Sequence, residues 1–85
     1  MTDSTTLQVR QINNGQSEIW LEAHGKELTP RRLLATNEVL NVTRRQCPAD
    51  VFETFYKQSH VALGQIGSLS VPNLGEIASE LKLKI

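Results

Sequence analysis

The feature that most constrains the fold is a pair of strand-like segments, residues 7–12 and 18–23, separated by Asn13-Asn14-Gly15-Gln16. An Asn-Gly pair supplies the positive φ angles that a tight hairpin turn requires. Residues 7–24 are therefore predicted to form a β-hairpin. Because side chains alternate along a strand, its second strand has an apolar face and a polar face. The apolar face holds Ile19, Leu21 and Ala23, and the polar face holds Glu18, Trp20 and Glu22.

Two helices are predicted in the middle of the chain. Thr29 is a good N-cap and Pro30 suits the first helical position, so the first helix is expected over residues 30–41. Residues 42–46 stay open between helix and strand because β-branched side chains oppose the continuity of the helix. The second helix is expected from Pro48 to residue 63. Its apolar stripe recurs at steps of three and four and contains Phe52, Phe55, Tyr56, Ser59, Ala62 and Leu63.

The C-terminal part predicts a third helix and an extended end. Asn73 is expected to cap this helix, and Glu76 completes a pattern typical of a capping box. Residues 81–85 alternate apolar side chains with lysines, which allows a short C-terminal strand that joins the hairpin. Residues 64–72 are expected to form a loop or a short extended piece. Residues 1–6 are polar and expected to be a disordered tail. The prediction is thus a small α+β domain over residues 7–85, with an N-terminal hairpin and three helices.

A chain of 85 residues buries a limited core, and the sequence shows no pattern of a disulfide or a structural metal site that would stabilise it. Cys47 is its single cysteine, and no Cys/His pairs stand at zinc spacing. We therefore expect a homodimer with no metal and no cofactor. No signal peptide or apolar membrane span is recognised in the sequence, so we expect a cytoplasmic protein without membrane contact.

Residues 74–83, LGEIASELKL, resemble the first helix of helix-turn-helix proteins. The resemblance implies DNA binding. The sequence ends after this helix, so the second helix that would enter the major groove is not supplied, and Lys82 stands where the motif usually has a turn glycine.

Four arginines are the candidate phosphate contacts: Arg31, Arg32, Arg44 and Arg45. If residues 30–46 were one helix, Arg31 and Arg45 would lie about 40° apart around its axis. A balance of nine basic against nine acidic residues disfavours a dedicated nucleic-acid binder.

Other chemical motifs are weaker. Cys47 precedes Pro48 at an expected helix N-terminus, where the dipole would lower the thiol pKa, but a buried or capping cysteine is the default interpretation. His24 and His60 are interpreted as surface residues. The Gly64-x-x-Gly67 spacing fits the clamp loop of KH domains, although an ordinary turn explains it better. No acid/base pair or nucleophile motif stands out, so no enzyme activity is predicted.

Trp20 gives the strongest indication of binding. It shares a strand face with Glu18 and Glu22, which points to solvent if Ile19 and Leu21 form the core, and tryptophan is enriched at protein interfaces. The alternative is that a helix covers this face. We therefore expect a non-enzymatic regulatory module that binds a protein partner through Trp20, Glu18 and Glu22. The alternative function is a small nucleic-acid-associated regulator that uses the four arginines and the terminal helix.

Overall fold

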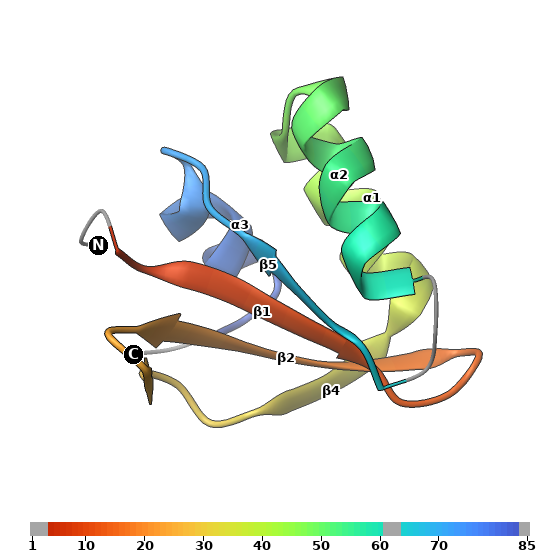
Figure 1. Ribbon diagram of the computed structural model, residues 1–85, viewed down its shortest axis with the longest axis horizontal. Coiled ribbons are helices and arrows are strands. Elements are labelled where there is room, and N and C mark those ends of the chain that lie inside the picture. Colours follow the sequence, from red (N-terminus) through yellow and green to blue (C-terminus); the bar gives the residue numbers. More distant parts are fainter. Residues whose placement is uncertain (1–3, 61–63, 84–85) are drawn as a thin grey trace.

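The computed structural model describes residues 4–60, with only the backbone of His60, and residues 64–83. Within these ranges the protein is an α+β domain in which one antiparallel sheet packs against three helices, as the sequence predicts. Figure 1 shows β4, β2, β1 and β5 side by side, with α3 behind the sheet, α2 beside β5 and α1 continuing from β4 behind α2. The elements are β1 (Thr6–Gln11), β2 (Gln16–Ala23), β3 (Lys26–Glu27), β4 (Arg32–Ala35), α1 (Thr36–Gln46), α2 (Ala49–His60), β5 (Ile66–Leu69) and α3 (Leu74–Glu80).

The predicted hairpin is confirmed, but its turn is not the expected one. Strands β1 and β2 pair in antiparallel register, with Gln8 opposite Trp20. Their connection is a wider loop in which the N–H groups of Ile12 and Asn13 both donate to the Gln16 carbonyl. The positive φ angles occur instead where β2 turns into β3, at His24 and Gly25, with values of 53° and 75°. Positive φ at both central residues is typical of a tight type I′ hairpin turn.

The segment after β3 corrects the prediction of a helix over residues 30–41. β2 pairs with β3 at Glu22–Glu27 and with β4 at Ile19–Arg32. Between these two pairs, two residues of β2 lie opposite the four residues 28–31 that connect β3 to β4. These four residues form a bulge, and β4 then continues the pairing with β2. Thr29 is buried, and its Oγ1 accepts the Leu21 N–H at 3.0 Å rather than capping a helix. A proline without an N–H is tolerated at such a bulge. Pairing with β2 therefore overrides the local helix signal.

Helix α1 begins at Thr36, six residues after the predicted start at residue 30, and it includes residues 42–46, which the sequence left open between helix and strand. The Thr36 N–H donates to the Gly15 carbonyl at 3.0 Å, so the hairpin loop supplies an acceptor for the first helical turn. The Thr36 and Ser17 hydroxyls are hydrogen-bonded at 2.8 Å. Val39 and Thr43 face the core. Residues 42–46 are thus the last turns of a helix.

Helix α2 is confirmed over residues 49–60, whereas residues 61–63, including Ala62 and Leu63, lie outside the described ranges. Phe55 and Ser59 of its predicted stripe are buried, but Tyr56 is 43% exposed. The short extended piece expected within residues 64–72 is β5, which pairs with β1. An added Cβ at Gly67 would lie 2.5 Å from the Ser59 Cβ, so glycine allows α2 to approach β5 closely. Gly67 is therefore a packing residue in a strand and not part of a clamp loop.

Helix α3 is confirmed, with Leu74, Ile77 and Leu81 buried as expected. The predicted capping box is wrong, because the Asn73 side chain makes no cap bond and its Nδ2 donates to the Gln46 carbonyl at 2.8 Å.

A helix-ending turn, and not the allowed strand, follows α3 at residues 81–83. The Lys82 N–H donates to the Ser79 carbonyl and the Leu83 N–H donates to the Ala78 carbonyl. These two bonds define a Schellman motif, in which Lys82 takes the left-handed position at a φ of 59°. Residues 84–85 lie outside the described ranges.

The core lies between the helices and one face of the sheet. The sheet contributes Leu7, Val9, Ile19 and Leu21, each with no exposed area, together with Leu69 at 1%. The helices contribute side chains from α1, α2 and α3 to the same cluster. β1 begins inside the expected tail, and Thr5 is buried, so the ordered domain extends to at least Thr5, while residues 1–3 are outside the described ranges. None of the described helices has the length and apolar character needed to cross a membrane.

Candidate functional site

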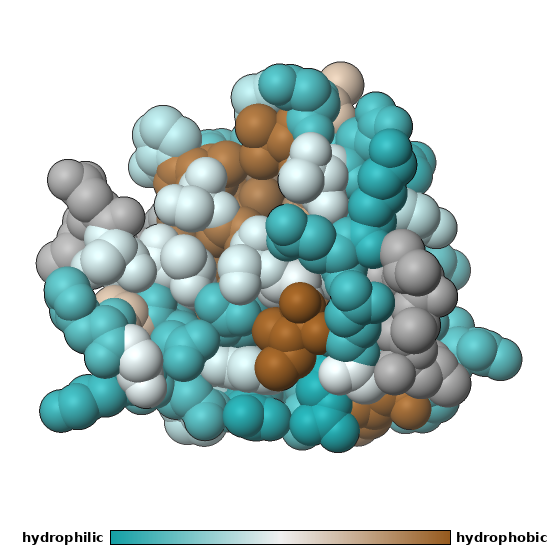
Figure 2. All heavy atoms as spheres, in the orientation of Figure 1, coloured by the Kyte–Doolittle hydropathy of each residue, from teal (hydrophilic) through white to brown (hydrophobic). Residues whose placement is uncertain are grey.

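The apolar cluster that the described helices form with the sheet lies on the face of Leu7, Val9, Ile19 and Leu21, and we call the opposite face of the sheet the open face. The strand register places its side chains in rows across the sheet. One row runs from Leu33 through Glu18 and Arg10 to Ile66, and Leu33 and Ile66 are each 49% exposed. In the view of Figure 2, apolar residues form separate patches between hydrophilic ones. The predicted division of β2 into an apolar face and a polar face is confirmed.

Trp20 lies on the open face, as predicted, but it is only 3% exposed. The expected exposure to solvent is wrong, and Trp20 is not part of the apolar cluster that the described helices share with the sheet. The Arg31 guanidinium lies over the ring, with its central carbon 3.9 Å from the ring centroid. A flat cation at this distance is attracted by the electron density of an aromatic face. Trp20 is therefore covered by a charged side chain from the bulge.

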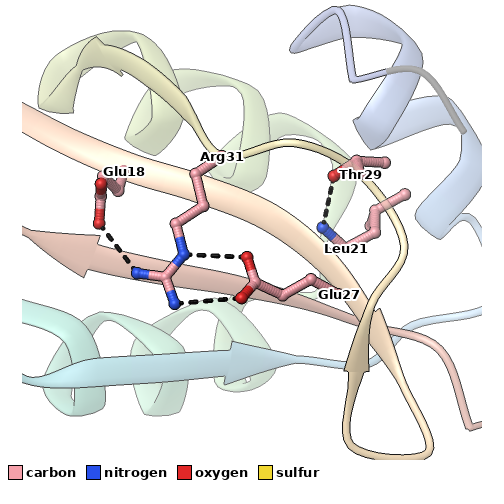
Figure 3. Close-up of polar contacts among 5 residues, drawn as sticks. All are labelled: Glu18, Leu21, Glu27, Thr29 and Arg31. Carbon is pink, nitrogen blue, oxygen red and sulfur yellow. Dashed lines mark hydrogen bonds and ion pairs between the residues drawn. The ribbon is translucent and has the colours of Figure 1, made fainter.

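Two carboxylates hold the Arg31 side chain in this position (Figure 3). Its Nε and Nη2 donate to the two oxygens of Glu27 at 2.9 and 3.3 Å, and its Nη1 donates to Glu18 at 3.3 Å. The hydrogen bond from Arg31 lowers the pKa of Glu27 below its ordinary value, and the same bond raises the pKa of Arg31. We call Trp20, Arg31, Glu18 and Glu27 the Trp–Arg cluster.

Two buried nitrogen atoms on the open face have no hydrogen-bond partner among the described residues. They are the Nε1 of Trp20 and the Nε of Arg10. The neighbouring polar groups are paired with one another: Gln8 donates to Thr6 at 2.7 Å and accepts from Ser68 at 2.9 Å. A buried N–H without an acceptor costs about 1–3 kcal/mol, so this face is less completely satisfied than an ordinary interior.

The structure does not bring the four candidate arginines together. Arg31 belongs to the bulge and Arg32 to β4, whereas Arg44 and Arg45 end α1. Arg31 is held by two glutamates, and Arg45 pairs with Glu80 of α3 at 2.7 Å. Arg44 lies over the Phe52 ring at 5.2 Å from its centroid. The condition for placing Arg31 and Arg45 near one another, a single helix over residues 30–46, is not met, because α1 begins at Thr36.

Cys47 caps the C-terminal end of α1 by donating its N–H to the Thr43 carbonyl. Burial raises the pKa of its thiol, so the default interpretation of a capping cysteine is confirmed and the alternative of a dipole-lowered pKa is not. His24 lies in the β2–β3 turn and is hydrogen-bonded to Ser4 at 2.9 Å. Among the described residues no cluster of His, Cys, Asp or Glu side chains has the arrangement of a metal site.

A surface feature that the sequence reasoning missed is an open hollow of about 940 Å³ between β4 and the end of α3. Residues 30–33 line one side, and Ser79, Lys82 and Leu83 line the other. Three of these residues are basic and none is acidic. We call it the basic groove. Its two sides come from segments about fifty residues apart in the sequence, so no local pattern predicts the groove. The one hint in the sequence is Lys82, which stands where a turn glycine is usual.

Comparison of the chain with known protein families, with curated proteins and with solved structures finds no match. The site is therefore interpreted from its own geometry.

Proposed function

We propose that this protein is a non-enzymatic interaction module that binds a protein partner through the open face, and that its first partner is a second copy of itself. The observation that carries the proposal is the row Leu33–Glu18–Arg10–Ile66, which has half-exposed apolar ends and charged residues between them. Apolar contacts combined with complementary charges are typical of protein interfaces. A domain of this size also gains stability from additional apolar burial.

The Trp–Arg cluster supports this proposal by making the centre of the face rigid. Trp20 packs against the Arg31 guanidinium, which two glutamates hold in place. A pre-ordered surface loses less conformational entropy when it binds. In this arrangement a partner contacts Arg31, Glu18 and Glu22, while Trp20 supports them from below.

Site-specific cross-linking of the purified protein tests the proposal. A photoreactive amino acid replaces Ile66, at the end of the row, and in a control it replaces Tyr56, which is 43% exposed on α2. We expect a covalent dimer from position 66 and little from position 56. Sedimentation at micromolar concentration should give a dimer mass. A monomer mass together with no cross-link at position 66 would remove the proposal.

Nucleic-acid binding is the weaker candidate. The net charge is zero, and two of the four arginines are already in ion pairs with glutamates. Titration with duplex DNA at about 150 mM salt, where charges are screened beyond about 8 Å, tests this alternative. Sub-micromolar, sequence-selective binding would make it the leading function.

A further inference from the structure

We infer that the basic groove binds an acidic peptide segment in extended conformation, which adds to the outer edge of β4 and places its carboxylates on Arg32 and Lys82. The groove shares Arg31 and Leu33 with the open face, but its proposed ligand contacts, Arg32 and Lys82, are not part of the open-face interface, so the inference goes beyond the proposed function. Variants of Arg32 and Lys82 test the groove, and the cross-link at Ile66 tests the open face.

The first support is the charge of the groove. Arg32 and Lys82 are exposed, and neither has an ion pair among the described residues. The third cation, Arg31, is already held by Glu18 and Glu27. Among the described residues, the groove therefore presents two unpaired positive charges and no carboxylate in its lining. Charge complementarity favours an anionic ligand.

The second support is the free edge of the sheet. β4 pairs with β2 on one side and with no other described strand. Some of the peptide N–H and C=O groups of an edge strand point outwards and can pair with an added strand. Leu33 is 49% exposed beside this edge, and Leu83 lines the opposite side of the groove. An extended peptide that alternates acidic and apolar side chains matches this arrangement.

The third support is the backbone at Lys82. The Schellman motif places this residue at a φ of 59°, where glycine is the usual choice because it has no Cβ. The folded protein is less stable with lysine in this left-handed conformation than with glycine, so folding stability does not explain the lysine. Local backbone strain of this kind clusters at binding sites. The lysine at the groove is therefore explained by its charge and not by its contribution to folding.

A protein ligand fits better than a nucleic acid. Glu27 lies beside the groove, because its carboxylate is paired with the groove residue Arg31. A phosphate backbone places a charge at every nucleotide and would meet this carboxylate, whereas a peptide can place its acidic side chains only at Arg32 and Lys82.

The experiment measures fluorescence anisotropy with a labelled eight-residue peptide in which glutamate alternates with valine. The comparison probes are the same peptide with glutamine in place of glutamate, and a single-stranded oligothymidine. We expect saturable binding of the acidic peptide, at least about tenfold weaker binding of the glutamine peptide, and weakening by salt. No saturable binding of the acidic peptide, or tighter binding of oligothymidine, would overturn the inference.

The variant Lys82→Gly separates binding from folding, because the two effects have opposite signs. It should raise the Tm by several degrees and weaken the acidic peptide about fivefold or more. Arg32→Gln should weaken the peptide to a similar extent, and Lys82→Arg should retain the affinity. Lys26→Gln removes the same charge outside the groove and should change the affinity by less than about twofold. Equal losses for Lys82→Gly and Lys26→Gln would contradict a site at the groove.

Discussion

The two faces of the sheet bury their central residues to similar extents by different means. On the face covered by helices, Leu21 has no exposed area and lies in the apolar cluster. On the open face, its neighbour Trp20 is 3% exposed, and a guanidinium fixed by two carboxylates covers it. The covered face depends on hydrophobic packing. The open face also depends on charge, so side-chain ionisation and single polar substitutions should affect it selectively.

The largest expected effect tests whether Trp20 is a core residue. Because it is almost completely buried, Trp20→Ala should lower the free energy of unfolding by about 3–5 kcal/mol, against about 2–5 kcal/mol for Leu21→Ala. This replaces the expectation from the sequence that Trp20 chiefly serves association. Urea denaturation of both variants measures the difference. A cost below about 1 kcal/mol for Trp20→Ala would mean that the open face does not bury this ring in solution.

The next effect tests the tight packing of the covered face. Gly67→Ala should destabilise the protein by about 1–3 kcal/mol, because its Cβ would lie 2.5 Å from the Ser59 Cβ. Gly75→Ala is the matched control, since nothing lies within 4 Å of its added Cβ and it is in helix α3. That variant should gain up to about 1 kcal/mol from helix propensity. Thermal unfolding of both variants measures the two changes in stability, which should have opposite signs. Equal changes for Gly67→Ala and Gly75→Ala would contradict the close packing of α2 against β5.

A smaller effect tests the cover over Trp20. Arg31→Ala removes the cation–π contact and both ion pairs, and it should lower the stability by less than either destabilising substitution above. Trp20 is the single tryptophan of the chain, so its fluorescence reports this position directly. We expect its emission to shift to longer wavelength as the ring meets water. Arg32→Ala should leave the emission unchanged, and an unchanged spectrum in Arg31→Ala would show that other groups shield the indole.

The smallest effect is a pH dependence. Arg31 lowers the pKa of Glu27 from its ordinary value of 4.5 when the chain folds. The resulting stabilisation is present above pH 4.5 and is lost as the pH falls through the lower pKa of the folded state. Glu27→Gln should therefore flatten the acid limb of the stability curve. Parallel curves for the two proteins below pH 4.5 would mean that this carboxylate is not held by Arg31 in solution.

Local patterns in the sequence predict the elements that local forces determine. Alternation predicts the hairpin, a spacing of three and four residues predicts α2, and a capping pattern predicts α3; all three elements are present, although the capping box itself does not form. The helix predicted at Pro30 fails because Thr29 bonds to the Leu21 N–H, a partner that no local pattern reveals. The pairing of β5 with β1 was not predicted for the same reason, because Leu69 and Leu7 are paired in the sheet but separated by most of the sequence.

The candidate site was predicted only in part. Alternation along β2 correctly placed Trp20 with Glu18 and Glu22 on one face. Its burial depends on Arg31, which reaches the ring only because the bulge at residues 28–31 shifts the register of the neighbouring strand. The basic groove depends on the approach of Lys82 to β4. These two segments are about fifty residues apart in the sequence, and residue periodicity predicts only local structure.

The pairing of Leu7 with Leu69 also determines the order of assembly during synthesis. β1 and β2 can form as soon as the first hairpin has left the ribosome, but β1 keeps one unpaired edge until β5 follows. Contacts between such distant residues form slowly, because a long loop must close first. During this interval the nascent chain offers β1 to any other strand, including β5 of a neighbouring chain. An exchange of β5 between two chains is therefore the misfolding route that this topology favours.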